Sequence, residues 1–392
     1  MNTNILKLTK KFAYFIGIYI EKFLAFARIQ SMKKVIKKPI EYGLTRAEAE
    51  EKLRNENFER IPVSLYRYIH IKNPEEMREK LLTMWKNLDC LGRIYIAQEG
   101  INAQMSVPEH NWDAFKSELY QISEFTGVPL KIGITGGKAF IKLQIKIRKQ
   151  IVADGLTMDD YDISNVGKHL TAKEFNEAMN SDDTIVVDMR NHYESEIGYF
   201  TGAVTPQVDT FREELPTVAE QLQGNEDKKL LLYCTGGIRC EKASAYLKHQ
   251  GFKDVNQLHG GIIDYKHQVE REGLENKFLG SNYVFDERGR EQIGDGVISN
   301  CHQCGNTCDR HVNCKNLACN LLFLQCENCE EKMKTTCSSK CKRVVNMPEE
   351  KQRAYYKKHG DGSHIRFSKS LRARERFAQQ SPFQKILSFF QN

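Results

Sequence analysis

The segment LLYCTGGIRCEKASAYL, residues 231–247, restricts the fold more than any other part of the chain. An apolar run ends at Cys234, two glycines follow, and the next residues have helical character up to Gly251. The same alternation occurs upstream, where TIVVDMR is rich in β-branched residues and TFREELPTVAEQLQ has helical spacing. Strands that alternate with helices predict an α/β domain over residues 165–280, with a parallel sheet covered on both faces.

The position of Cys234 predicts a reactive thiol. Open parallel sheets bind ligands at the carboxyl ends of their strands, and Cys234 follows such a strand. The glycines after it would let backbone N–H groups point at the sulfur, while Arg239 and the next helix would add positive charge. Such surroundings stabilise a thiolate, a persulfide or a bound oxyanion, whereas the alternative is a buried, inert cysteine. We therefore take Cys234 as the candidate catalytic residue, in an active-site loop that comprises Thr235, Gly236, Gly237, Ile238, Arg239 and Cys240.

The spacing of the arginine argues against a cysteine phosphatase. That class places the arginine six positions after the nucleophile, and here position 240 is a cysteine while Arg239 lies one position early. A shorter loop suits a sulfur-sized charge better than a phosphate. The loop alone therefore favours sulfur transfer through a persulfide on Cys234. Cys240 is either a resolving thiol for such chemistry or a small packed residue.

Residues 61–155 predict a second, smaller α/β domain. SLYRYIHI alternates like a strand, two further strand patterns surround the turn at Glu99-Gly100, and two segments that begin with proline have helical spacing. With FIKLQIKIR as the last strand, the order β-α-β-β-α-β is that of a ferredoxin-like fold. This last strand places Lys142, Lys146 and Arg148 on one face, which would meet either RNA phosphate or solvent.

A cysteine-rich segment occupies residues 298–345. Nine of the twelve cysteines lie in it, and we expect no export signal at the N-terminus, so metal binding is favoured over a disulfide framework. Four close pairs would form two structural zinc sites, with an iron–sulfur cluster as the alternative that would also supply electrons. Sequence alone leaves the pairing open, and Cys308, His302 and His311 are substitutes or bystanders. The candidate ligands are Cys301, Cys304, Cys314, Cys319, Cys326, Cys329, Cys337 and Cys341.

The charge is concentrated at the two ends. Residues 1–40 and 351–392 each carry a net charge of +8, which leaves −9 for the rest of a chain whose total is +7. Basic ends indicate a polyanion partner, either RNA or a membrane surface, unless they are merely solvated. Residues 1–60 are expected to be a basic extension, amphipathic or disordered, unless translation starts at Met32. The apolar run within this extension is too short for stable membrane insertion. The basic tail, residues 346–392, interleaves aromatic and basic residues in a manner that suits RNA contact.

Two further segments resemble rhodanese signatures. VVDMRNHYESEIGYFTGAV is similar to the rhodanese segment in which Asp188 and Arg190 end a strand and support the active loop. LHGGIIDY is similar to the Gly-Gly signature of the same fold, while Tyr199 departs from the histidine that rhodaneses usually have. The central domain is therefore expected to be rhodanese-like.

The resemblance extends over residues 64–345. GRIYIAQEGINAQMSVP, IRKQIVADG, DMRNHYE, YCTGGIRCEKASAYLKHQGF and SNCHQCGNTCDRHVNCKNLACN together resemble the bacterial oxygen-dependent tRNA uridine-34 hydroxylase family. This resemblance implies a ferredoxin-like domain, a rhodanese domain and a cysteine-rich part. It also implies a cytoplasmic enzyme that binds the anticodon region of tRNA and converts the wobble uridine to 5-hydroxyuridine. Molecular oxygen is the implied co-substrate and Cys234 is implied to be essential, while the electron donor and the oligomeric state are left open.

The loop and the family imply different chemistry for the same sulfur. A rhodanese loop predicts sulfur transfer, whereas the family's reaction leaves oxygen on C5 of uracil. We hypothesise that a Cys234 thiolate adds to C6 of uracil and so raises the electron density at C5, which then reacts with oxygen. A sulfurtransferase that carries a Cys234 persulfide and a non-catalytic, zinc-containing RNA-binding module are the alternatives.

Overall fold

The computed structural model describes residues 46–156 and 160–360. The expectations for the first forty residues, including the amphipathic helix and a start at Met32, lie outside these ranges, as does the tail beyond residue 360. The first described helix, α2 (Arg46–Arg54), has Glu48 in its first turn and basic residues in its last turn, which suits the helix dipole. None of the helices in the two described ranges has both the length and the apolar character that crossing a membrane would require.

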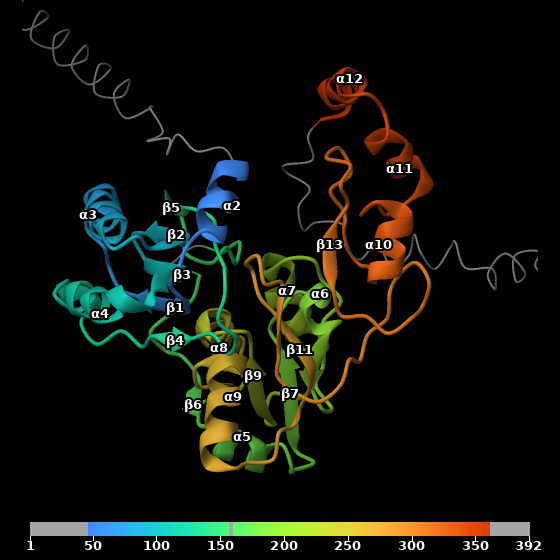
Figure 1. The fold of residues 1–392 in the computed structure, drawn as a ribbon. Helices are drawn as coiled ribbons and strands as arrows, with labels where there is room; N and C mark the ends of the chain where they lie inside the picture. The colour runs from blue at the N-terminus through green and yellow to red at the C-terminus, as the bar shows by residue number, and fades with distance from the viewer. Residues whose placement is uncertain (1–45, 157–159, 361–392) are drawn as a thin grey trace, which may run out of the picture. The chain divides into compact units, whose positions relative to one another are not determined.

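The N-terminal domain is built on a five-stranded sheet with the order β4-β1-β3-β2-β5 (Figure 1). Its strands are β1 (Arg60–Tyr68), β2 (Leu91–Ala97), β3 (Gly100–Pro108), β4 (Lys131–Ile132) and β5 (Leu143–Ile147). Its helices are α3 (Pro74–Asn87) and α4 (Trp112–Tyr120), with short 3-10 turns at Glu109–Asn111 and Ser123–Phe125.

The strand order confirms the ferredoxin-like fold and corrects its last strand. The predicted final strand FIKLQIKIR is β5, a fifth strand that pairs in parallel with β2 at the far edge of the sheet. The place beside β1 that closes a ferredoxin-like sheet belongs to β4, which pairs antiparallel with β1 at Val63 and Ser64. Because β4 has only two residues, it has no alternating pattern that sequence reasoning could detect.

The described helices of this domain, α3 and α4, cover one face of the sheet. Val63 and Leu65 of β1 belong to one buried cluster with Leu81 and Trp85 of α3 and Phe115 of α4. Side chains alternate along a strand, so the residues between these apolar positions face the other way. The second face carries none of the described helices of its own domain and is called the helix-free face; Tyr66 and Tyr68 on it contact α8 (Ile238–His249) of the central domain.

The central domain has a four-stranded parallel sheet with the order β6-β10-β9-β7. One buried cluster joins α7 and α8 to Leu230 and Leu232, and another joins α5 and α9 to Leu231 and Tyr233. Helices thus cover both faces, which confirms the expected α/β architecture. The elements are β6 (Lys168–Leu170), α5 (Ala172–Ala178), β7 (Thr184–Asp188), α6 (His192–Ser195), β8 (Gly198–Phe200), α7 (Phe211–Gln221), β9 (Lys229–Tyr233), α8 (Ile238–His249), β10 (Asp254–Leu258) and α9 (Gly261–Glu272).

The C-terminal region continues from a three-stranded sheet, β12-β11-β8, into the cysteine-rich part. There a small buried cluster contains Leu321, Phe323 and three cysteines. The segment expected to be a basic tail begins with a helix, α12. The elements are β11 (Phe278–Tyr283), β12 (Arg290–Gln292), β13 (His311–Asn313), β14 (Leu322–Leu324), α10 (Glu327–Met333), α11 (Ser339–Val345) and α12 (Glu349–His359).

Candidate active site

Cys234 lies at the carboxyl end of a central strand. It directly follows β9, which lies between β10 and β7, and its side chain is buried. The backbone N–H of Gly237 donates a hydrogen bond to its Sγ at 3.1 Å. Gly237 has a φ of 94°, a conformation that glycine adopts at little cost, and it immediately precedes α8. The chain therefore turns back over the sulfur and starts a helix there.

The surroundings of Cys234 favour its thiolate. Burial raises the pKa of this thiol, but hydrogen bonds from Cys240 and from backbone N–H groups, together with the charge of Arg239, outweigh burial. The pKa of Cys234 is lowered to about 5 as a result. Burial and the neighbouring thiolate raise the pKa of Cys240 well above its usual range. At neutral pH the loop thus contains a Cys234 thiolate that accepts a hydrogen bond from the Cys240 thiol.

Arg239 acts on this sulfur through its charge. Its guanidinium donates two hydrogen bonds to the Glu194 carboxylate, from Nη1 to Oε1 at 2.6 Å and from Nη2 to Oε2 at 2.8 Å. Arg239 thus supplies the positive charge expected near the sulfur, while both of its terminal nitrogens contact Glu194. Sequence reasoning missed Glu194, although its place three residues after Asn191, in a capping box, was visible.

Asp188, at the end of β7, and Arg190, two residues later, do not line the pocket; they lie at the strand ends that support the loop. Arg190 donates to both oxygens of Asp188, at 2.8 and 2.6 Å, and the Tyr233 hydroxyl donates to Asp188 at 2.8 Å. Arg190 also donates to the carbonyl oxygen of Gly198 at 2.6 Å. This fully buried network joins the ends of β7 and β9 and thereby fixes where Cys234 leaves the sheet.

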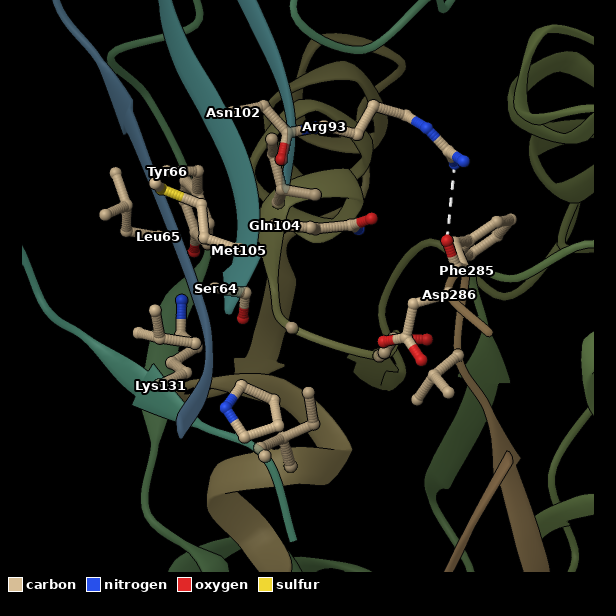
Figure 2. Close-up of a pocket in the computed structure, with 18 of the residues that line it drawn as sticks. Ser64, Leu65, Tyr66, Arg93, Asn102, Gln104, Met105, Lys131, Phe285 and Asp286 are labelled. Carbon is tan, nitrogen blue, oxygen red and sulfur yellow. Dashed lines mark hydrogen bonds between the residues drawn. The ribbon is translucent and has the colours of Figure 1, made fainter. Parts of the chain in front are cut away.

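Cys234 opens onto a pocket of about 340 Å³. Four loop residues line it beside the cysteine, namely Thr235, Gly236, Ile238 and Arg239. The helix-free face of the ferredoxin-like sheet forms a second wall, and Phe285, Asp286 and Arg288 from the C-terminal region contribute a third (Figure 2). Sequence reasoning missed both of these walls. The ferredoxin-like wall includes Ser64, Tyr66, Arg93, Asn102, Gln104 and Lys131.

Helix α8 connects the two domains around this pocket. The Tyr66 hydroxyl donates to Glu241 at 2.9 Å, and the Tyr68 hydroxyl donates to the carbonyl oxygen of Ile238 at 3.2 Å. Lys242 is buried, with Nζ 3.0 Å from carboxylate oxygens of both Glu99 and Asp154. These long-range contacts hold the ferredoxin-like sheet against the Cys234 loop.

The eight predicted metal ligands form two groups of four. Within each group the sulfur atoms lie within 4.8 Å of one another. Two close pairs, Cys301 with Cys304 and Cys326 with Cys329, form one group. The pairs that alternate with them along the chain form the other group. Two Sγ–Sγ distances are 3.6 Å, close to the roughly 3.8 Å edge of a tetrahedron with Zn–S bonds of about 2.3 Å. The groups are Cys301, Cys304, Cys326 and Cys329, and Cys314, Cys319, Cys337 and Cys341.

The three bystander candidates lie outside both groups. His302 contacts Glu196, with 2.8 Å between Nε2 and the carboxylate oxygen. His311 is packed between Tyr193 and Tyr283, and burial lowers its pKa to about 4. Cys308 belongs to neither set of four sulfur atoms.

Successive parts of the chain match three sequence families. These are the UPF0176 acylphosphatase like domain over residues 60–151, the rhodanese-like domain over 171–268 and the rhodanase C-terminal domain over 279–342. The chain is also 56% identical over 304 residues to the tRNA uridine(34) hydroxylase of Leptospira interrogans, which covers 77% of this chain and 83% of that relative. The chain belongs to the tRNA uridine(34) hydroxylase family.

Other members of the tRNA uridine(34) hydroxylase family match over a larger share of the chain. The relative from Photorhabdus laumondii is 46% identical over 329 residues, 83% of this chain and 93% of that one. The relative from Escherichia fergusonii is 45% identical over 337 residues, 86% of this chain and 96% of that one. The family expected from the sequence motifs is confirmed.

Proposed function

We propose that this chain hydroxylates C5 of uridine 34 in tRNA, with Cys234 as the nucleophile. The observation that carries the proposal is a cysteine with a pKa of about 5 at the wall of a pocket of about 340 Å³, in a chain of this family. That volume lies within the range of roughly 300–1,000 Å³ typical of ligand pockets. The wobble base lies in the anticodon loop, so it can enter such a pocket without the opening of a duplex.

The first step is addition of the Cys234 thiolate to C6 of uracil. The S–C6 bond forms and the electron pair of the C5–C6 double bond moves towards the C4 carbonyl, which gives an enolate with charge on C5 and O4. The electron-rich C5 then forms a bond to molecular oxygen, and the resulting peroxide anion takes up a proton to give a hydroperoxide at C5. An external two-electron donor, such as a pair of thiols that becomes a disulfide, reduces this group to a hydroxyl with release of water. Loss of the C5 proton and departure of Cys234 yield 5-hydroxyuridine. A thiolate of low pKa serves both as nucleophile and as leaving group.

The remaining loop residues position this sulfur. Gly237 presents its N–H to Sγ, Arg239 supplies positive charge, and Asp188 with Arg190 holds the strand ends in place. The partner is the anticodon region of tRNA, and we assign the reaction to the cytoplasm on that ground.

Both four-cysteine groups are proposed to bind structural zinc. Four thiolates complete a tetrahedral site and leave no open position, so zinc bound there would stabilise the cysteine-rich part. The two groups account for the eight expected ligands and contain none of the residues that line the pocket.

Sulfur transfer is the second candidate function. The same N–H donors that stabilise a thiolate would also stabilise the terminal sulfur of a Cys234 persulfide, and the matched rhodanese-like domain supports this alternative.

Nucleoside mass spectrometry of tRNA tests these functions together. A strain that lacks the gene is complemented with wild type, Cys234→Ser or Cys308→Ser, and is grown with and without oxygen. We expect wild type and Cys308→Ser to restore 5-hydroxyuridine in aerobic cells and Cys234→Ser to fail. Loss of a thiolated nucleoside in the deletion strain would instead indicate a sulfurtransferase, and an unchanged profile would indicate a binding module.

A further inference from the structure

A row of polar side chains crosses the ferredoxin-like sheet on its helix-free face. Ser64 of β1 is paired with Gln104 of β3 on one side and with Lys131 of β4 on the other. Side chains of residues directly opposite each other lie on the same face of a sheet. Neighbouring strands are about 4.8 Å apart, so Gln104 and Lys131 flank Ser64 with their backbones roughly 10 Å apart.

All three side chains line the pocket that contains Cys234. Figure 2 shows Ser64, Gln104 and Lys131 on the wall that faces Phe285 and Asp286. Ser64 is short while its two neighbours are long, so the row has a gap at its centre. A flat ring can stand in this gap with one long side chain at each end.

The two flanking groups are available to a ligand. In residues 46–156 and 160–360, Lys131 has no carboxylate within ion-pair distance and the Gln104 amide has no hydrogen-bond partner. Nearby pocket residues differ in this respect, because Asn102 donates to the carbonyl oxygen of Ile151 at 3.2 Å and Arg93 donates to that of Phe285 at 3.3 Å.

Lys131 is held close to the Cys234 loop. Its ammonium group lies 3.9 Å from the centre of the Tyr66 ring, and the Tyr66 hydroxyl is fixed by Glu241 of α8. Burial lowers the pKa of Lys131 to about 8, and among the neighbouring charges the Cys234 thiolate raises it most. At neutral pH Lys131 is therefore a cation on the wall of the pocket that also contains the Cys234 sulfur.

These groups match one edge of uracil. That edge carries O4, N3–H and O2 in sequence. A carboxamide accepts a hydrogen bond from N3–H and donates one to O2, and an ammonium donates to O4. The match with O4 improves during the reaction, because thiolate addition at C6 places negative charge on this oxygen. A cation positioned there before the reaction stabilises the enolate.

We propose that the uracil ring of nucleotide 34 stands over Ser64, with O4 facing Lys131 and the N3–O2 end facing Gln104. This placement rests on the proposed function and leaves the C5–C6 edge towards Cys234. It makes Lys131 a catalytic residue and a determinant of specificity, since the exocyclic amine of cytosine would meet the ammonium where uracil presents an acceptor.

Deuterium exchange at C5 tests the placement without oxygen or a reductant. In D₂O the enolate takes up a deuteron at C5, and reversal of the addition leaves deuterium on that carbon. The purified full-length protein is incubated anaerobically with a tRNA that carries uridine 34, and nuclease fragments are analysed by mass spectrometry. Wild type is expected to label position 34, and the same tRNA with cytidine 34 is expected to stay unlabelled.

Four variants and one control define the expected result. Lys131→Met should slow the exchange about a hundredfold, without loss of tRNA affinity, and Lys131→Arg should recover part of the rate. Gln104→Leu should lower kcat/KM for exchange about tenfold. Ser64→Leu should block exchange by filling the gap. Lys80→Met removes the same charge from an exposed position on α3, on the helix-covered side of the sheet, and should exchange like wild type.

Two outcomes would overturn the placement, and they differ in what else they affect. Wild-type exchange rates in Lys131→Met and Ser64→Leu would refute the placement while leaving the addition step intact. No exchange by the wild-type protein would refute the addition step and the placement with it.

Discussion

Arg239 and Glu194 form a two-point ion pair beside the Cys234 loop, with N–O distances of 2.6 and 2.8 Å and both side chains buried. Glu194 fixes the position of the guanidinium, whose positive charge acts on the Cys234 sulfur. The charge of Arg239 lowers the pKa of Cys234, yet its terminal nitrogens are directed at Glu194. The pocket side of the sulfur is thereby left to the ligand.

Removal of the Glu194 charge should destabilise the protein strongly. In Glu194→Gln the buried guanidinium loses its partner, and a broken buried pair typically costs about 3–5 kcal/mol. Chemical denaturation of wild type and variant measures this difference. Lys253→Met, which breaks the exposed pair with Asp227, is the control and should leave stability nearly unchanged. Equal losses of unfolding free energy in the two variants would contradict the assignment of Arg239 and Glu194 as a stabilising buried ion pair.

The reactivity of Cys234 should depend on pH with a midpoint of about 5. The lowered pKa means that the thiolate predominates above this midpoint and is lost as the pH falls through it. The rate of alkylation by iodoacetamide, measured on the peptide that contains Cys234, should therefore increase as the pH rises through 5 and should no longer change near pH 7. A midpoint near the ordinary thiol value would disprove the proposed activation.

Cys240 should contribute to this shift through its hydrogen bond. Cys240→Ala removes the donor, so the midpoint should rise by about one unit, which corresponds to roughly 1.4 kcal/mol. Cys240→Ser keeps a hydroxyl donor at the same place and should retain most of the shift. If both variants titrate like wild type, the thiol of Cys240 is not a donor to Cys234.

The two glycines of the loop should respond differently to alanine. A Cβ on Gly237 would lie 2.8 Å from the Tyr66 hydroxyl, and its φ of 94° is unfavourable for other residues by about 1–2 kcal/mol. A Cβ on Gly236 would meet no atom within 4 Å. We expect Gly237→Ala to lower the free energy of unfolding and Gly236→Ala to leave it nearly unchanged, as measured by denaturant titration. The reverse order would contradict the loop geometry.

Metal content should show that the cysteine pairs interleave. Wild type is expected to bind two zinc ions by elemental mass spectrometry. The double variant with Cys301→Ser and Cys326→Ser should still bind one zinc ion, because both residues belong to the same group. Cys301→Ser with Cys314→Ser should abolish both sites.

Consecutive pairing along the chain would give the opposite result for the two double variants. Cys308→Ser, outside both groups, should retain both ions and serves as the control. Loss of metal in this control would show that the assignment of ligands is wrong.

Local patterns carried much of the fold prediction. The apolar run before Cys234, the glycines after it and the helix that follows define a strand, a turn and a helix through interactions between near neighbours. The same holds for β1, β2, β3 and the two helices of the ferredoxin-like domain. The strand β4 was missed because two residues have no period, and Glu194 was missed because an acidic residue in a helix start is common on protein surfaces.

The sequence by itself determined where Cys234 lies along a strand–loop–helix unit, the family of the chain and the identity of the eight clustered cysteines. Only the tertiary structure decided what surrounds them. The row of Lys131, Ser64 and Gln104 depends on the register of three strands, and the link from Tyr66 to Glu241 joins residues 175 positions apart. The cysteine pairs join in an interleaved order for the same reason. Such relationships arise from how distant segments pack, and no local pattern of residues specifies them.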